Sequence, residues 1–252
     1  MCEMSRPDPI LKINNLSVSY PAGFGKRKPA LDRLNLEVAG GEIFGLLGPN
    51  GAGKTTMIKA IMGLLYPDGG EIFLFGNSPP RIQDRARLGY LPEVSTYYWF
   101  LTAEELLKMY GSICGMNKKE LLERIEYVLN LVGLTAERRQ LIRTFSKGMQ
   151  HRLGIAQALL HSPEFLVLDE PFSGLDPLGR VQVREILKGL KSEGRTILLS
   201  SHELSEAELI CDRICIMKNG KVLKSGAMEE LLKELGEQSL ERYFLSVIGE
   251  RI

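Results

Sequence analysis

The sequence predicts an α/β fold with a mostly parallel sheet, an N-terminal antiparallel β portion and an inserted helical subdomain. Three observations carry this prediction. Short apolar runs of strand length, separated by turn signals, fill residues 11–76. Residues 94–147 carry apolar side chains at helical spacing instead. From residue 165 onward, strand-like runs alternate with helical stretches, which is typical of parallel β-α-β units.

The first part of the chain contains four strand-like runs. They are "LKINNLSVSY" (11–20), "LDRLNLEV" (31–38), "EIFGLL" (42–47) and "GEIFLFG" (70–76). Their spacing and turns predict an antiparallel portion beside a central sheet. We expect residues 10–93 to form the first half of an α/β core.

Residues 94–147 are expected to form the helical subdomain. Thr102 and Glu105 have the spacing of a capping box, so a helix should begin there. In each of two successive helices the apolar residues are expected to share one face: Leu106, Leu107, Tyr110 and Ile113, then Leu121, Leu122, Ile125, Val128, Leu129 and Val132.

The remaining part, residues 148–252, is expected to complete the α/β core. Its strand-like runs are "FLVLDE" (165–170), "TILLSSH" (196–202) and "RICIMKNG" (213–220). Near the end, "SLERYFLSVIGE" (239–250) has helical spacing of its apolar residues. We therefore expect residues 1–252 to form a single domain with one helical insertion.

The composition limits the kinds of partner. The 252 residues include 32 Lys and Arg against 31 Asp and Glu, a formal charge of +1, so charge gives no argument for a nucleic-acid partner. None of the four cysteines forms a C-x-x-C pair, which argues against a disulfide framework or a zinc site. The first ten residues lack the apolar stretch of a signal peptide. No apolar run reaches the length of a membrane span, so a role at a membrane would need another chain.

A glycine loop between a strand and a helix predicts a phosphate site. Gly48, Gly53, Lys54 and Thr55 fit the pattern G-x-x-x-x-G-K-[ST], which defines a P-loop NTPase core. Glycines let several backbone N–H groups point at one phosphate, and the helix adds the positive end of its dipole. Lys54 is expected to reach the β- and γ-phosphates of ATP, and Thr55 to hold Mg²⁺.

Two adjacent carboxylates end the apolar run "FLVL". Ligands gather at the carboxyl ends of strands in open α/β sheets. Asp169 is therefore expected to hold Mg²⁺, directly or through water. Glu170 is the candidate general base for the water that attacks the γ-phosphate.

A second glycine turn enters a helix at "FSKGMQHRLG", residues 145–154. Such a turn can bind an anion for the same reason as the P-loop. Because the P-loop already covers the phosphates from one side, this turn suggests that a second subunit contacts the nucleotide from its other side.

With these motifs the chain resembles the ATP-binding subunits of ABC transporters. The family's elements occur in order over nearly the whole chain. They are Tyr20 (adenine loop), "GPNGAGKTT" (Walker A), "GYLPE" (Q-loop), "FSKGM" (signature), "FLVLDEP" (Walker B), "SGLD" (D-loop) and "SSH" (switch histidine). The resemblance implies a head-to-tail dimer, homomeric or heteromeric, with two ATP molecules at its interface. It also implies a separate transmembrane permease subunit and a peripheral position on the cytoplasmic face of the membrane.

The resemblance assigns roles to residues on this chain. His202 would act in catalysis together with Glu170, by contacting the γ-phosphate in cis. The Mg²⁺ ligands would be Thr55, Glu93 and Asp169. The residues expected to bind ATP in trans are Ser146, Lys147, Gly148 and Asp176. The residues expected to bind ATP in cis are Tyr20, Gly48, Pro49, Asn50, Gly51, Ala52, Gly53, Lys54, Thr55 and Thr56.

Two motifs depart from the family pattern. The signature is usually close to LSGGQ, whereas here Lys147 and Met149 replace a Gly and the Gln. The Q-loop position is Glu93 rather than Gln. Both features are similar to ATPase subunits of exporter-type ABC systems that use separate membrane chains.

The cluster "STYYWF" (95–100) is a candidate docking segment for such a chain, although packing within the helical subdomain explains it almost as well.

Two other interpretations compete with a transport ATPase. A soluble ABC protein of translation or DNA repair usually carries two ATPase units or a long coiled-coil insertion, and this chain has one P-loop and a short helical insert. A P-loop kinase or GTPase acting alone has no place for "FSKGM" before the Walker B strand.

Overall fold

A computed structural model describes residues 9–23, 25–234, 236 and 239–249 of the chain. Its N-terminal part forms a three-stranded antiparallel sheet of order β2-β1-β4. These strands are β1 (Pro9–Pro21), β2 (Arg27–Ala39) and β4 (Gly69–Leu74). The predicted antiparallel β portion is therefore confirmed.

The central sheet has six strands in the order β5-β6-β7-β3-β8-β9. Every neighbouring pair is parallel except β8 and β9. Its strands are β3 (Ile43–Leu47), β5 (Leu88–Leu91), β6 (Phe165–Leu168), β7 (Thr196–Ser201), β8 (Arg213–Lys218) and β9 (Lys221–Ala227). The predicted α/β class with a mostly parallel sheet is confirmed, while β5 and β9 were not recognised as strands from the sequence.

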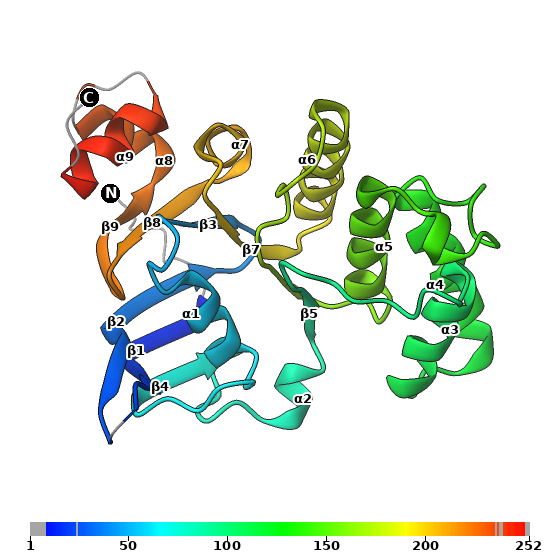
Figure 1. Ribbon diagram of the computed structural model, residues 1–252, viewed down its shortest axis with the longest axis horizontal. Coiled ribbons are helices and arrows are strands. Elements are labelled where there is room, and N and C mark those ends of the chain that lie inside the picture. The colour runs from blue at the N-terminus through cyan, green and yellow to red at the C-terminus, as the bar shows by residue number, and fades with distance from the viewer. Residues whose placement is uncertain (1–8, 24, 235, 237–238, 250–252) are drawn as a thin grey trace, which may run out of the picture.

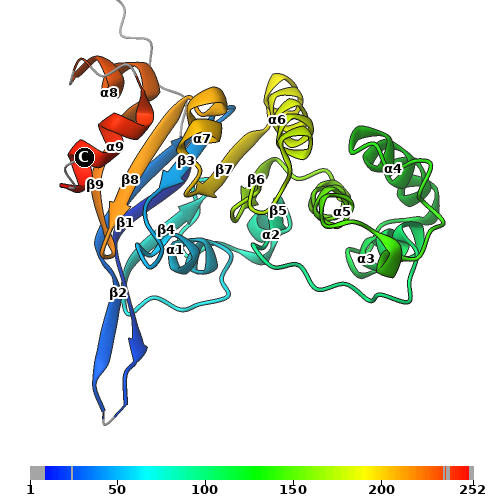
Figure 2. The same ribbon diagram turned by 45° about the horizontal axis from the view of Figure 1, so that its top comes forward.

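Side chains from both faces of the central sheet build two cores. On β6, Phe165 and Val167 join the core shared with the antiparallel sheet and helix α1 (Lys54–Ile61). Leu166 and Leu168 face the opposite core, which is built with the remaining helices. Figures 1 and 2 show the central sheet between these layers. The other core helices are α5 (Lys147–Leu159), α6 (Pro177–Ser192), α7 (Leu204–Ile210), α8 (Met228–Glu234) and α9 (Leu240–Ile248).

The inserted segment is helical and lies at the end of the molecule away from the antiparallel sheet (Figure 1). Its elements are α3 (Ala103–Ile113), α4 (Lys118–Leu131) and the 3₁₀ helix η1 (Ile142–Thr144), after a short α2 (Ile82–Arg85) and β5. The predicted capping box exists: Glu105 N–H donates to Thr102 Oγ1, and Thr102 N–H donates to Glu105 Oε2. Helix α5 begins one residue before the boundary at 148 that the sequence suggested, and the division into core and subdomain stays a prediction.

Two of the apolar residues at helical spacing in this segment are exposed. Ile113 is 73% exposed and Leu122 is 44% exposed. Ile113 ends α3, and Leu122 lies beside Leu121, which takes the buried position of that turn. A helix buries only one stripe of its surface, and Ile113 and Leu122 lie outside that stripe. Within the described residues, no helix is long and apolar enough to cross a membrane.

Gly89 on β5 allows α5 to pack closely against the central sheet. A Cβ at this position would lie closer than 3.0 Å to the backbone oxygen of Ala158 and to Leu166 and Pro163 side-chain atoms. A backbone oxygen inside a helix cannot move cheaply, so we expect Gly89→Ala to lower the free energy of unfolding by about 3 kcal/mol. Urea titration followed by circular dichroism measures this loss.

Gly189 supplies the matched control for this substitution. It lies within α6, and a Cβ added there would meet no atom within 4 Å. Alanine forms helices better than glycine, so Gly189→Ala is expected to raise the free energy of unfolding by ~0.5–1 kcal/mol. Equal stability of the wild type and Gly89→Ala would contradict the close packing of β5 against α5.

Candidate functional site

The glycine loop follows β3 and leads into α1, as the sequence predicted. Gly53 is the N-cap of α1 and has φ of 106°, a left-handed conformation that side chains rarely adopt. Gly48 lies against the end of β8, where a Cβ would be 2.5 Å from the Met217 backbone oxygen. Both glycines are therefore required by the shape of the loop.

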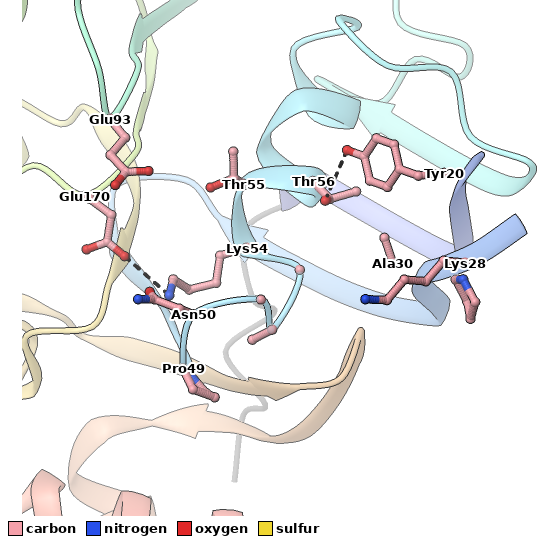
Figure 3. Close-up of a pocket in the computed structure, with 14 residues that line it drawn as sticks. Tyr20, Lys28, Ala30, Pro49, Asn50, Lys54, Thr55, Thr56, Glu93 and Glu170 are labelled. Carbon is pink, nitrogen blue, oxygen red and sulfur yellow. Dashed lines mark hydrogen bonds and ion pairs between the residues drawn. The ribbon is translucent and has the colours of Figure 1, made fainter. Parts of the chain in front are cut away.

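This loop forms one wall of a cavity of about 470 Å³. Figure 3 shows Tyr20 at one end and Glu93 with Glu170 at the other, with Lys54 and Thr55 between them. The Tyr20 hydroxyl lies 3.3 Å from Thr56 Oγ1. The cavity is lined by Tyr20, Lys28, Pro29, Ala30, Pro49, Asn50, Gly51, Ala52, Gly53, Lys54, Thr55, Thr56, Glu93 and Glu170.

The ammonium group of Lys54 is held inside the loop. Its Nζ donates to the Gly48 backbone oxygen at 2.6 Å and lies 3.3 Å from Glu170 Oε1. Both charged side chains are nearly buried, with 6% and 7% exposure. The ion pair therefore satisfies two charges that would be costly to bury alone.

Asp169 and Glu170 follow β6 and enter the site from the central sheet. Asp169 is 1% exposed, and Thr55 Oγ1 donates to its Oδ1 at 3.4 Å. Burial, together with the negative charge of Asp169, raises the pKa of the nearby Tyr90 hydroxyl. Glu170 has φ of 53°, an uncommon conformation for a residue with a side chain.

Thr55 and Asp169 offer the hard oxygen ligands that Mg²⁺ prefers. No group of three or more His, Cys, Asp or Glu side chains among the described residues could hold a metal ion. A cation here would therefore have few protein ligands, and Mg²⁺ is commonly held in this way, with phosphate and water completing its shell. The two side chains fit a magnesium ion that arrives with a nucleotide.

His202 lies directly after β7 and contacts Glu170. Its backbone N–H donates to Glu170 Oε2 at 3.2 Å, and its Nδ1 lies 2.8 Å from the same oxygen. An ionised carboxylate can only accept hydrogen bonds, so the ring donates from Nδ1 in this contact. The two predicted catalytic residues are thus brought together, although His202 does not line the cavity.

Glu93 lies after β5, in an exposed position on the rim of the same cavity. It also lines a neighbouring cavity of about 330 Å³, together with Lys147 and His151 of α5. Glu93 therefore lies between the glycine loop and the signature helix of its own chain.

The signature residues lie at the start of α5, away from the glycine loop. Ser146 is the N-cap of this helix, and its Oγ accepts the Met149 N–H at 3.2 Å. The Lys147 ammonium group lies directly against Gly174. The four residues predicted to act in trans, Ser146, Lys147, Gly148 and Asp176, share a separate cavity of about 360 Å³, which no glycine-loop residue lines.

Asp176 also has a structural task that the sequence did not reveal. It is the N-cap of α6, and its Oδ1 accepts the Gly179 N–H at 2.8 Å. Sequence reasoning also missed Lys28, Pro29 and Ala30 as cavity residues, because β2 reaches the site only through the pairing of the antiparallel sheet.

Comparisons with known proteins agree with these motifs. A family model described as "ABC transporter" matches residues 31–173. An uncharacterised ABC transporter ATP-binding protein of Synechocystis sp. is 48% identical over 228 residues, which cover 88% of this chain and 64% of that protein. The bacitracin transport ATP-binding protein of Bacillus licheniformis is 42% identical over 227 residues, covering 89% of this chain and 72% of that protein. The Nod factor export ATP-binding protein I of Sinorhizobium fredii is 37% identical over 243 residues, covering 95% of this chain and 69% of that protein.

Solved structures support the same assignment. The ATP-binding subunit of an ABC transporter aligns with a TM-score of 0.82 at 33% identity, covering 95% of this chain and 99% of that one. A dimeric ATP-binding cassette in a post-hydrolysis state, bound to ADP and Pi, aligns with a TM-score of 0.78 at 25% identity and covers 86% of this chain and 98% of that one. The chain therefore belongs to the ABC transporter family, as one of its ATP-binding subunits.

Proposed function

We propose that the chain hydrolyses ATP and uses the energy to drive transport through a separate transmembrane subunit, in the export direction. The observation that carries this proposal is the meeting of Lys54, Asp169 and Glu170 beside the glycine loop. The cation comes from the start of α1, and the metal ligand and the general base come from the end of β6. Lys54 and Glu170 line the cavity, and Asp169 contacts Thr55 beside it. These are the parts that phosphoryl transfer to water requires.

The glycine loop binds the phosphates of ATP in this proposal. Backbone N–H groups of residues 50–53 and the start of α1 supply positive charge, and the Tyr20 ring stacks on the adenine. Lys54 pairs with the β- and γ-phosphates. Thr55 and Asp169 hold Mg²⁺, which neutralises phosphate charge when it is bound.

Glu170 is the general base for the attacking water. It is now held by Lys54 and by His202, at 3.3 Å and 2.8 Å. An arriving phosphate attracts Lys54 and so releases one oxygen of Glu170 for the water. His202 donates its Nδ1 proton to Glu170, so its ring must turn or gain a proton before it can donate to the γ-phosphate in cis.

The signature residues complete the site in a second subunit. Within one chain they lie on a cavity that no glycine-loop residue lines, so they form a surface separate from the glycine-loop cavity. A head-to-tail dimer, with either an identical chain or a related one, brings each signature turn to the other subunit's ATP. The likeness to a dimeric cassette bound to ADP and Pi supports this arrangement.

An exposed aromatic cluster supports docking on a membrane partner. Tyr98, Trp99 and Phe100 are 52%, 61% and 56% exposed, and Phe100 packs against both neighbours. Their exposure favours docking over packing within the helical segment. The names of relatives that act in bacitracin transport, Nod factor export and linearmycin resistance favour the export direction. The chain would then sit peripherally on the cytoplasmic face of the membrane, with no nucleic-acid partner.

Purification from native membranes tests this function. A tagged copy of the chain should co-purify with a multi-span membrane protein, and that protein should change its rate of ATP hydrolysis. Co-purification with ribosomes instead would favour the soluble alternative in translation. A purified chain that binds ATP but shows no hydrolysis with any membrane fraction would contradict the proposal.

Glu93→Gln is expected to change metal and nucleotide binding in opposite directions. The carboxylate attracts Mg²⁺ but repels the γ-phosphate when the metal is absent. ATP should therefore bind about fivefold more tightly in the presence of a chelator, since unit charges at ~4 Å in water interact by about 1 kcal/mol. Half-maximal hydrolysis should need several times more Mg²⁺.

Two titrations measure this effect: ATP binding with a chelator present, and hydrolysis against Mg²⁺ at fixed ATP. Glu123→Gln on the exposed face of α4 removes the same charge away from the cavity and should leave both curves unchanged. Curves for Glu93→Gln that coincide with wild type would remove Glu93 from the metal site and leave it as a hinge at most.

A further inference from the structure

Ser200 is a buried hydroxyl in the middle of the central sheet. It lies near the end of β7 in the run "TILLSSH" and has 0% exposure. Its strand neighbours Leu198 and Leu199 are equally buried and apolar. A hydroxyl in such surroundings is unfavourable unless its hydrogen bonds are satisfied, so its partners show what it does.

Ser200 Oγ makes two hydrogen bonds, one with the backbone of Glu170 and one with the side chain of Asp169. The Glu170 backbone N–H donates to Ser200 Oγ at 2.8 Å. Ser200 Oγ donates to Asp169 Oδ1 at 2.6 Å. The direction of these bonds is fixed, because an N–H can only donate and a carboxylate can only accept, so the single hydroxyl proton must point at Asp169.

These two bonds constrain different parts of the site. The bond from Glu170 N–H ties down a residue whose φ is 53°, a conformation that the surrounding structure has to enforce. The bond to Asp169 fixes the rotamer of a carboxylate whose same oxygen also accepts from Thr55 Oγ1 at 3.4 Å. The Ser200 hydroxyl therefore fixes both the orientation of the Asp169 carboxylate and the backbone conformation of Glu170.

We propose that Ser200 is a positioning residue for ATP hydrolysis, which holds Asp169 toward Thr55 and Glu170 toward the γ-phosphate. This inference rests on the proposed function. Ser200 does not line the cavity, so it acts through its two neighbours and not by touching the nucleotide. If Ser200 served only packing, Ser200→Ala would lower the stability of the protein and leave its turnover number unchanged.

Ser200→Ala tests the proposal through a split between kcat and KM. Hydrogen bonds to charged groups are strong, so we expect kcat to fall about tenfold or more. The KM for ATP should stay within about twofold of the wild type, because the glycine loop is unchanged. A second readout does not depend on turnover: binding of Mn²⁺, followed by electron paramagnetic resonance with a non-hydrolysable ATP analogue, should weaken several-fold.

Thr196→Val is the matched control. Thr196 lies on the same strand, is 1% exposed, and its Oγ1 accepts the Gly41 N–H at 2.9 Å, at the end of β7 away from the site. This variant removes a buried hydroxyl and leaves an unpaired N–H, as Ser200→Ala does. It should lower the melting temperature and leave kcat and Mn²⁺ binding unchanged.

The outcomes separate the inference from the function beneath it. If the wild type hydrolyses ATP and Ser200→Ala keeps kcat and Mn²⁺ binding within about twofold, the positioning role is wrong while the function stands. Equal losses in Thr196→Val would also overturn it, because the effect would then follow stability alone. If the wild type shows no hydrolysis, the proposed function fails, and Mn²⁺ binding still decides whether Ser200 orients Asp169.

Ser200→Cys carries the test if Ser200→Ala does not fold. Its side chain fills nearly the same space, but a thiol is a weak donor and a weak acceptor. A folded Ser200→Cys protein should show the same fall in kcat with a small change in KM. An unchanged kcat in this variant contradicts the proposal.

Discussion

Glu170→Gln is expected to lower kcat for ATP hydrolysis by about 100-fold or more, with little change in ATP affinity. Loss of a general base typically costs roughly 10²–10⁴-fold, and the amide has the same shape but cannot take up a proton. The variant loses the ion pair with Lys54. The amide oxygen can still accept the His202 N–H, now at 3.2 Å, and Lys54 keeps its bond to the Gly48 backbone oxygen, so the loop should still bind ATP. ATP should therefore be bound and trapped rather than lost.

Trapped ATP should also hold two subunits together. Size-exclusion chromatography of Glu170→Gln with ATP is expected to show a dimer that the same protein lacks without nucleotide. Glu164→Gln is the control, because it removes the same charge just before β6 begins. Glu164 forms an exposed ion pair with Arg87, so this variant should hydrolyse ATP within about twofold of the wild type. An ATP-loaded monomer of Glu170→Gln would argue against a homodimeric site and leave a different ATPase chain as the partner.

The glycine loop and the strand end could be predicted because their signals are local. Gly53 needs its left-handed φ within the turn itself, and Asp169 directly follows the strand that carries it. The capping box at Thr102 is equally local, and the structure contains it. The strand order of the central sheet, by contrast, depends on pairings between residues far apart in the chain.

The residues that sequence reasoning missed reach the site through such long-range contacts. Lys28 enters the cavity because β2 pairs with β1, and Ser200 meets Asp169 because β7 lies beside β6. In the sequence Ser200 is only a hydroxyl residue within an apolar strand run. This pattern does not identify the hydrogen-bond partners of the hydroxyl. Ile113 and Leu122 fitted a helical pattern and are nevertheless exposed, because apolar spacing does not show where the buried stripe ends.

Ser146→Arg is expected to lower ATP hydrolysis about 100-fold while ATP binding to a single subunit stays within about twofold. Ser146 and the glycine loop lie on different surfaces of one subunit, because the cavity at Ser146 contains no glycine-loop residue. We therefore expect the bulky side chain to leave its own subunit's nucleotide untouched. In a head-to-tail dimer the same side chain would block the γ-phosphate of the partner's ATP. The substitution also removes the N-cap of α5, which costs about 1 kcal/mol of stability.

Asn117→Arg controls for the lost cap. Asn117 is the N-cap of α4, where its side chain accepts the Glu120 N–H at 2.9 Å, and this variant should lose similar stability while keeping full hydrolysis.

Lys54→Ala provides a second comparison, because it should weaken ATP binding within its own subunit. In a mixture of Ser146→Arg and Lys54→Ala subunits, each mixed dimer combines one intact glycine loop with one intact signature turn. Such dimers should regain part of the hydrolysis that neither variant shows alone, to the extent that one complete site suffices. Weakened ATP binding to isolated Ser146→Arg, equal to that of Lys54→Ala, would mean that the signature turn serves its own subunit's nucleotide.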